Sequence, residues 1–260
     1  MTPSLYVRVL LVSVAVVLLL GTSLPTAERS RPPTRPASAR LDTITAADVR
    51  SLAAFDDARA LAIDPRGRLY VADAGRDVVA ILDTGGTRLH TLGGSGVRPG
   101  RFTEPTDVDP TNGLQLLVAD AGNGRIQRFS SEGQFLESLP LHRPAKTKPS
   151  GSVFEQDRES LASGASGRPT AVISTSDQNI LALDGHHRAL LRWDSTRRVE
   201  VLASANAVGS TALHDPVALA LDANRRLYVA DAEAILVFDR FGTFVRRLKG
   251  PDATSPVRAL

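Results

Sequence analysis

Short runs of apolar and β-branched residues alternate with turn-forming residues along most of the chain. In the first part of the pattern the runs cover residues 61–64, 69–74, 78–83 and 88–92, and Pro, Gly, Asp and Thr stand between them. Runs of this length, interrupted in this way, are typical of β-strands, whereas an amphipathic helix needs apolar residues three or four positions apart. No segment after residue 41 has a convincing helical pattern, so the sequence predicts an all-β fold.

The strand pattern repeats along the chain. Each repeat closes on an aspartate fifteen residues after its opening position, and these aspartates are Asp73, Asp120, Asp184 and Asp231. Their spacings are 47, 64 and 47 residues, and the longer interval contains a low-complexity insertion at 141–167. Four short antiparallel strands in a period of roughly 40 to 50 residues are typical of one β-propeller blade. We therefore expect four recognisable four-stranded blades.

The second repeat has the most characteristic sequence. It reads Gly-Val-Arg-Pro-Gly-Arg-Phe-Thr-Glu-Pro-Thr-Asp-Val-Asp-Pro over 96–110, Leu-Val-Ala-Asp-Ala-Gly-Asn-Gly-Arg-Ile-Gln-Arg-Phe over 117–129 and Ser-Glu-Gly-Gln-Phe over 131–135. This segment closely resembles the repeat of the NHL family of β-propellers. The resemblance covers roughly residues 55–249. It implies an NHL-type propeller, and families of this kind usually close with five or six blades.

Closure of the ring needs more than the four repeats. Residues 49–55 read as an outer strand, and residues 255–260 repeat the opening of the fourth repeat at 215–219. We therefore expect a partial closing blade shared between the termini. The chain stops before the second strand of that blade, so either the blade is incomplete, a second chain supplies it, or the sequence lacks its natural C-terminus.

The N-terminus has a different pattern. Arg8 precedes the run 9–20, which is apolar apart from Ser13, and small residues follow in 21–27. This order is typical of an export leader, so residues 1–27 are interpreted as a signal peptide or a membrane anchor. Residues 28–40 are interpreted as a Pro/Arg-rich linker and 41–260 as the propeller. The sequence thus predicts an extracytoplasmic location, secreted, periplasmic or membrane-anchored, although the excess of arginine after the run opposes the positive-inside tendency.

Composition and charge exclude several classes of function. The chain has no cysteine, which excludes disulfides, thiol nucleophiles and Cys-ligated metals. Residues 41–260 carry 26 basic and 27 acidic side chains, so the propeller has no overall cationic field, and nucleic acid is not an expected partner. Neither a glycine-rich phosphate loop nor a nucleophile elbow is present.

The four closing aspartates are expected to be structural. Each ends a strand just before a turn, and Arg125 follows Asp120 by five residues. A short carboxylate at such a position can accept backbone N–H groups of the turn or pair with an arginine. Because the feature recurs once per blade, blade architecture explains it better than catalysis does.

The position before each opening residue is expected at the mouth of the central channel, where the innermost strand begins. It is occupied by Asp57, Glu104, Arg168 and Asp215, with Asp107 and His214 close by in sequence. Calcium takes oxygen ligands, so Asp57, Glu104 and Asp215, with His214, are candidate ligands for calcium or another divalent cation. The resemblance implies an active site at this place, because NHL-like and related propellers include lyases and lactonases with a metal in the channel. The alternative is that these carboxylates cap turns or are solvated, and Arg168 supports it by placing a cation in the ring.

A candidate face for a ligand or partner adjoins the channel mouth. It comprises Arg168 and Asp107, together with Arg143, Lys146 and Lys148 of the insertion. The insertion joins the last strand of one blade to the first strand of the next. It is therefore either a flexible segment or a loop that binds a partner.

A repeated scaffold without a convergent catalytic set favours a binding protein. We expect a non-enzymatic binding or scaffolding propeller of the cell envelope that needs no cofactor and uses the channel-mouth face for a protein or a small ligand. The alternative is a metal-dependent lyase or lactonase-like hydrolase with a cation in the channel.

Overall fold

The computed structural model describes residues 53–110, 113–141, 166–205, 211–232 and 234–249. Contacts group residues 55–260 into one compact unit, separate from residues 1–54. The expected leader and linker at 1–40, the end at 255–260 and most of the insertion lie outside the described residues. Within the described ranges, no helix is long and apolar enough to cross a membrane.

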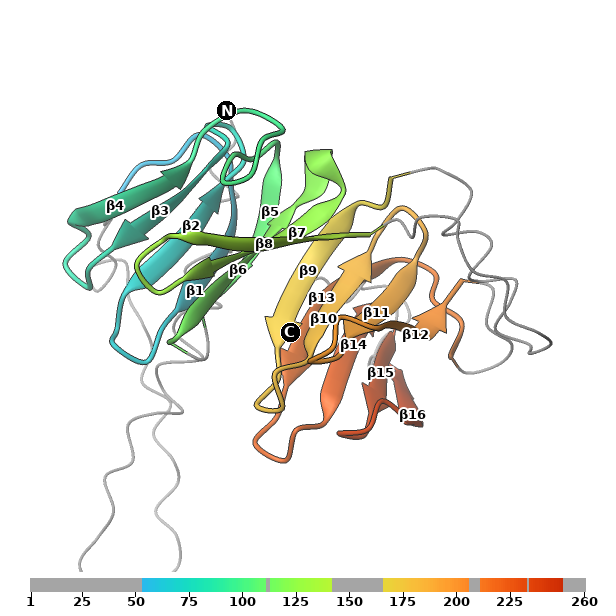
Figure 1. Ribbon diagram of the computed structural model, residues 1–260. Coiled ribbons are helices and arrows are strands. Elements are labelled where there is room, and N and C mark those ends of the chain that lie inside the picture. Colours follow the sequence, from blue (N-terminus) through green and yellow to red (C-terminus); the bar gives the residue numbers. More distant parts are fainter. Residues whose placement is uncertain (1–52, 111–112, 142–165, 206–210, 233, 250–260) are drawn as a thin grey trace, which may run out of the picture. The chain divides into compact units, whose positions relative to one another are not determined.

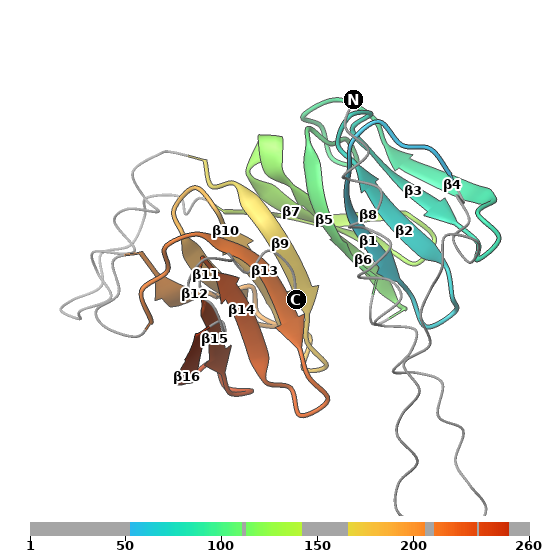
Figure 2. The ribbon, with the colours of Figure 1, turned by 180° about the vertical axis from the view of Figure 1, so that it is seen from behind.

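The described residues form four antiparallel sheets of four strands, each built from consecutive strands (Figures 1 and 2). Blade 1 consists of β1 (Ala58–Ile63), β2 (Leu69–Asp73), β3 (Val78–Leu82) and β4 (Arg88–Gly93). Blade 2 consists of β5 (Pro105–Asp109), β6 (Gln115–Asp120), β7 (Arg125–Ser130) and β8 (Phe135–Pro140). Blade 3 consists of β9 (Pro169–Ser174), β10 (Ile180–Asp184), β11 (Ala189–Trp193) and β12 (Val199–Ser204). Blade 4 consists of β13 (Pro216–Leu221), β14 (Leu227–Asp231), β15 (Ala234–Phe238) and β16 (Phe244–Lys249).

The all-β prediction is confirmed, and so are four four-stranded sheets. The strands of blade 1 follow the four apolar runs within one residue at most ends, but β1 begins three residues earlier than its run. The total number of blades and the closing blade remain predictions, because residues 49–52 and 255–260 lie outside the described part of the chain.

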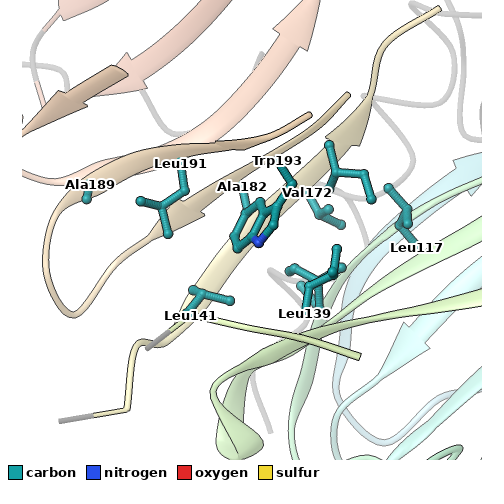
Figure 3. Close-up of a cluster of buried hydrophobic side chains, with 11 residues drawn as sticks. Leu117, Leu139, Leu141, Val172, Ala182, Ala189, Leu191 and Trp193 are labelled. Atoms are coloured by element: carbon teal, nitrogen blue, oxygen red, sulfur yellow. The ribbon is translucent and has the colours of Figure 1, made fainter. Parts of the chain in front are cut away.

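The described residues form three hydrophobic clusters, each shared by two consecutive blades. Blades 1 and 2 share one around Phe102 and Phe129, whose rings meet edge to face with centroids 5.7 Å apart. Blades 2 and 3 share a second around Trp193, and Figure 3 shows this indole beside Ala182 and Val172. Blades 3 and 4 share a third around Leu236 and Phe238. A single blade buries its faces only against its neighbours, which is why the repeat needs partners on both sides.

First strands of consecutive blades also contact one another, β1 with β5, β5 with β9 and β9 with β13. Between β5 and β9 the contact is made by carboxylates. Asp107 Oδ2 accepts the Val172 N–H at 2.7 Å, and Asp109 Oδ2 accepts the Ser174 N–H at 2.5 Å and its hydroxyl at 2.6 Å. The equivalent positions of the other first strands carry Ala60 and Ala62, Ala171 and Ile173, and Ala218 and Ala220. The carboxylate pair is therefore particular to the interface of blades 2 and 3.

The two ends of the insertion touch. Leu141 donates its N–H to the Gly124 carbonyl at 3.0 Å, and Gly167 packs directly against Leu141. A Cβ atom on Gly167 would lie 2.6 Å from the Leu141 Cβ and 2.3 Å from Asp184 Oδ2, so glycine is required there. The connection therefore leaves and re-enters the fold at almost the same point.

The carboxyl group of Asp107 makes stability depend on pH. Burial raises the pKa of Asp107 from 3.8 to about 7; the hydrogen bonds from the Val172 and Val108 N–H groups oppose this rise, and the nearby Asp109 charge adds to it. Protonated Asp107 thus stabilises the folded state, and this contribution to the free energy of unfolding is lost as the pH rises from about 4 to 7. Between pH 5 and 7.5 we expect the unfolding free energy of the wild type to fall, relative to Asp107→Asn, by at most about 1.4 kcal/mol per pH unit. Denaturant unfolding at a series of pH values measures this difference.

Asp215→Asn is the control, because this aspartate lies exposed on blade 4. Its pH profile should parallel that of the wild type between pH 5 and 7.5. Parallel profiles for wild type and Asp107→Asn would show that Asp107 does not titrate in this range.

Candidate functional site

The closing aspartates of the four repeats end the second strand of each blade and are fully buried. We call Asp73, Asp120, Asp184 and Asp231 the anchor aspartates. Each accepts one or two backbone N–H groups from the loop that leads into the first strand of its own blade. These bonds run from Asp56 and Asp57 to Asp73, from Thr103 to Asp120, from Arg168 to Asp184, and from His214 and Asp215 to Asp231.

Each anchor aspartate also has a partner that carries or can carry positive charge. Arg76 approaches Asp73 at 3.5 Å, Arg125 pairs with Asp120 at 2.7 Å, His187 with Asp184 at 2.7 Å and Arg247 with Asp231 at 2.8 Å. The predicted structural role, including the pair of Asp120 with Arg125, is confirmed. In blade 3 the imidazole of His187 takes the place of the guanidinium.

Glu104 and Arg168 of the predicted channel mouth are brought together. Their side chains form an ion pair of 2.5 Å between blade 2 and blade 3, and both are partly exposed. Glu104 has a left-handed backbone with φ of 55°, and its N–H is accepted by Asp77 of blade 1 at 2.7 Å. The carboxylate of Glu104 therefore already has a cationic partner from the same protein.

The other residues of the predicted mouth are not gathered into one site. Asp57 pairs with Arg59 at 2.7 Å, and the largely exposed imidazole of His214 lies 3.4 Å from Asp231. Asp107 is directed at the β9 backbone, as described above. Among the described residues, no three His, Asp or Glu side chains lie close enough together to hold a metal ion. The predicted ligands Asp57, Glu104, Asp215 and His214 thus do not form a ligand set in this structure.

The rest of the predicted partner face lies outside the described residues. Arg143, Lys146 and Lys148 belong to residues 142–165. Arg168 is described, and its guanidinium is paired with Glu104. The partner face at the channel mouth therefore remains a prediction.

A pocket of about 700 Å³ lies between blade 3 and the β15–β16 turn of blade 4. This volume is within the range of ligand-binding clefts in proteins. Its lining comes from the β9–β10 turn, from β11, from the segment 198–201 at the start of β12, and from Arg240 and Phe241. The pocket is mixed in character, with three arginines, three carboxylates and an aromatic ring.

The carboxylates of this pocket all have partners. Glu200 forms an ion pair with Arg192, and Asp177 pairs with Arg225 at 2.9 Å. Asp194 accepts the Thr196 hydroxyl and the Arg198 N–H, and these hydrogen bonds lower its pKa. The acidic groups are therefore committed to the fold.

Two arginines of the pocket form no close ion pair. Among the described residues, neither Arg198 nor Arg240 has an ion-pair partner. The guanidinium of Arg240 lies over the ring of Phe241 at 4.6 Å, and this ring is 64% exposed. Arg192 donates to the Phe241 carbonyl at 2.6 Å and so fixes the turn that presents the ring. The charge of Arg198 helps to lower the pKa of Asp194, and the lining carries as many carboxylates as arginines.

This pocket lies at the opposite end of the strands from the predicted channel mouth. In blade 3 the register pairs Pro169 with Asp184 at one end and Ile180 with Trp193 at the other, where the pocket lies. Sequence reasoning missed the pocket because it joins turns of two repeats. A detectable signal was the Arg-Phe pair in the β15–β16 turn, where the equivalent turn of blade 1 has Thr84 and Gly85.

Comparisons with known proteins support a propeller of this kind. No family model matches the chain. A segment of 75 residues is 39% identical to the human E3 ubiquitin-protein ligase NHLRC1, which corresponds to 28% of this chain and 19% of the ligase. The match supports the NHL repeat, although the chain covers only about a fifth of that relative.

Solved structures show the same fold at low sequence identity. Virginiamycin B lyase from Staphylococcus aureus is 12% identical with a TM-score of 0.55, over 78% of this chain and 58% of the lyase. The nidogen/laminin complex contains a chain that is also 12% identical with a TM-score of 0.55, over 79% of this chain and 68% of that one. At this identity the likeness establishes the β-propeller fold alone.

The anchor aspartates should dominate the stability of their blades. Asp120→Ala removes one acceptor each from the Thr103 N–H, from Arg125 and from the fully buried Gln127 amide. Removing one partner of a buried ion pair costs about 3–5 kcal/mol. We expect a loss of this size in denaturant unfolding, or failure to fold if the chain is less stable than that.

Asp56→Ala is the matched control, because Asp56 forms an exposed ion pair of 2.8 Å with Arg76. Exposed pairs contribute about 0–1 kcal/mol, so this variant should unfold close to the wild type. Equal losses for the two variants would contradict the anchoring role of Asp120.

Proposed function

We propose that this chain is a non-enzymatic binding propeller, exported or tethered by its N-terminal segment, and that it holds a protein partner in the pocket between blades 3 and 4. The observation that carries the proposal is the exposed ring of Phe241 at the pocket, with the Arg240 guanidinium over it at 4.6 Å and Arg198 in the same lining. Aromatic residues and arginine are enriched where proteins bind partners.

The channel-mouth residues favour binding over catalysis in this proposal. Glu104 is neutralised by Arg168, and Asp57 by Arg59. Both carboxylates thus have a cationic partner from the protein itself, which supports a structural role for them at the mouth. One of the solved neighbours is part of a complex between two proteins, which supports the binding role, whereas another is a lyase, which belongs to the alternative.

Export or tethering follows from the pattern of residues 1–40. A basic start, a short apolar run and a small-residue exit suit a leader or an anchor. Under this proposal the partner is met at the outer face of the membrane or beyond it.

Site-specific crosslinking tests both the pocket and the location. Phe241 is replaced by the photoreactive p-benzoylphenylalanine in the full chain, and intact cells are irradiated. We expect a discrete crosslinked species that added protease can reach from outside the cell, and its yield should fall about tenfold when Arg198→Glu and Arg240→Glu are introduced.

Two further positions serve as controls. Leu89 on β4 of blade 1 is 54% exposed and is not part of the pocket lining, so it should give no crosslink. Val97 is 73% exposed in the loop that enters blade 2. A crosslink at Val97 in place of Phe241 would move the binding face to the channel mouth, and protection from added protease would contradict export.

Metal content distinguishes the binding protein from the alternative enzyme. Under the proposal, the chain purified without chelators or a histidine tag carries no stoichiometric divalent cation by elemental mass spectrometry. About one calcium or zinc per chain, lost in Glu104→Ala with Asp215→Ala, would instead favour a lyase or hydrolase in the channel.

A further inference from the structure

Each described blade has two turns at the end of the strands opposite the predicted channel mouth, and all of these turns have a left-handed residue at the same place. The N–H of that residue donates to the carbonyl three positions earlier, and its φ lies between 62° and 87°. Residues with a side chain rarely adopt this conformation, because their Cβ atom comes too close to the following carbonyl. Five of the turns have glycine there, namely Gly67, Gly86, Gly113, Gly133 and Gly242. The other three have Gln178, Arg197 and Arg225.

The three exceptions are all associated with the pocket between blades 3 and 4. Gln178 stands between two lining residues, and Arg197 precedes the lining residue Arg198. Arg225 forms an ion pair of 2.9 Å with Asp177, which also lines the pocket. Strained backbone conformations persist where the surrounding structure holds them, and they cluster at sites that bind ligands. The exceptions therefore single out the pocket independently of its volume.

Stability alone does not explain the arginine at position 225. The side chains of Arg225 and Asp177 are 51% and 57% exposed, and exposed ion pairs contribute little to folding. A glycine at this position would adopt the same φ of 62° without the steric cost. The ion pair instead joins the β13–β14 turn of blade 4 to the β9–β10 turn of blade 3, which is a wall of the pocket.

Arg197 joins another turn of the pocket to blade 2. Its Nε donates to Glu137 Oε2 on β8 at 2.9 Å, and its Nη2 lies 2.6 Å from Oε1 of the same carboxylate. A two-point contact of this kind fixes direction as well as distance. The β15–β16 turn is held on blade 3 by Arg192, which donates to the Phe241 carbonyl at 2.6 Å. Each of the three turns that line the pocket is thus tied to a neighbouring blade.

Resting on the proposed function, we infer that Arg197 and Arg225 are positioning residues, which hold the turns of the pocket in the arrangement that binds the partner. Their left-handed backbone is retained because an arginine, unlike the glycine of the other turns, reaches a carboxylate of a neighbouring blade. A pocket whose walls are fixed beforehand loses less conformational entropy on binding. The two arginines therefore raise the affinity without contacting the partner themselves.

The first test needs no partner, because a chain without cysteine accepts two unique nitroxide labels. The labels are placed in the full chain at Ser176→Cys and Ala223→Cys, which are exposed residues of the β9–β10 and β13–β14 turns. Arg225→Gly and Arg225→Asn should both broaden the distance distribution in pulsed electron paramagnetic resonance, since both residues accept the left-handed backbone and lose the ion pair. The control Arg66→Gly, in the β1–β2 turn of blade 1, should leave the distribution unchanged.

The second test separates positioning from stability. Arg225→Gly should unfold at the same denaturant concentration as the wild type or at a higher one, because relief of the left-handed conformation offsets the loss of an exposed ion pair. The yield of the Phe241 photocrosslink should nevertheless fall at least about threefold in this variant, because the turns must then be ordered on binding. A structural role alone would lower stability and crosslinking together.

Arg197→Gly is compared in the same way, with labels at Leu136→Cys and Ser195→Cys, which are exposed residues of blades 2 and 3. An unchanged distance distribution in both glycine variants, or a full crosslink yield in a variant whose distribution is broader, would overturn the positioning role. Absence of the crosslink when both arginines are present, with the narrow distribution kept, would instead overturn the proposed function.

Discussion

The fold depends on one buried carboxylate per blade. Each anchor aspartate ends the second strand, binds the loop that opens the first strand, and pairs with a cationic or titratable partner. An ionised group without partners could not be buried, so the loop and the partner must be in place for the blade to form. The anchor aspartate thereby holds together the loop that enters the blade, the end of the second strand and the turn that follows it. The clusters around Phe102, Trp193 and Phe238 then join these units through their faces.

The sequence predicted the features that act within one repeat. Strand positions, the all-β class and the role of Asp120 with Arg125 follow from local patterns, since a strand and its turn lie close together in the chain. A second set of aspartates acts just as locally. Each accepts the backbone N–H groups two and four residues later in its own turn, and the set comprises Asp64, Asp83, Asp194, Asp222 and Asp239.

Features that join two repeats were not predictable in the same way. Glu104 and Arg168 are 64 residues apart in the chain and form an ion pair, which removes a carboxylate from the expected ligand set. Asp107 was assigned to the channel mouth because it is close to Glu104 in sequence, but its carboxylate accepts a hydrogen bond from the β9 backbone. The pocket requires Arg198 and Arg240 from two blades to meet. Periodicity gives the content of each blade but not the faces that neighbouring blades present to each other.

The contact between Leu141 and Gly167 bears on how such a protein can change over evolution. Because the chain leaves blade 2 and enters blade 3 at nearly the same point, the residues between them span almost no distance. The entropy of closing such a loop grows only with the logarithm of its length, so doubling it costs about 0.6 kcal/mol. Segments of very different length, up to an entire folded domain, can therefore be accepted at this junction while the blades on either side keep their packing.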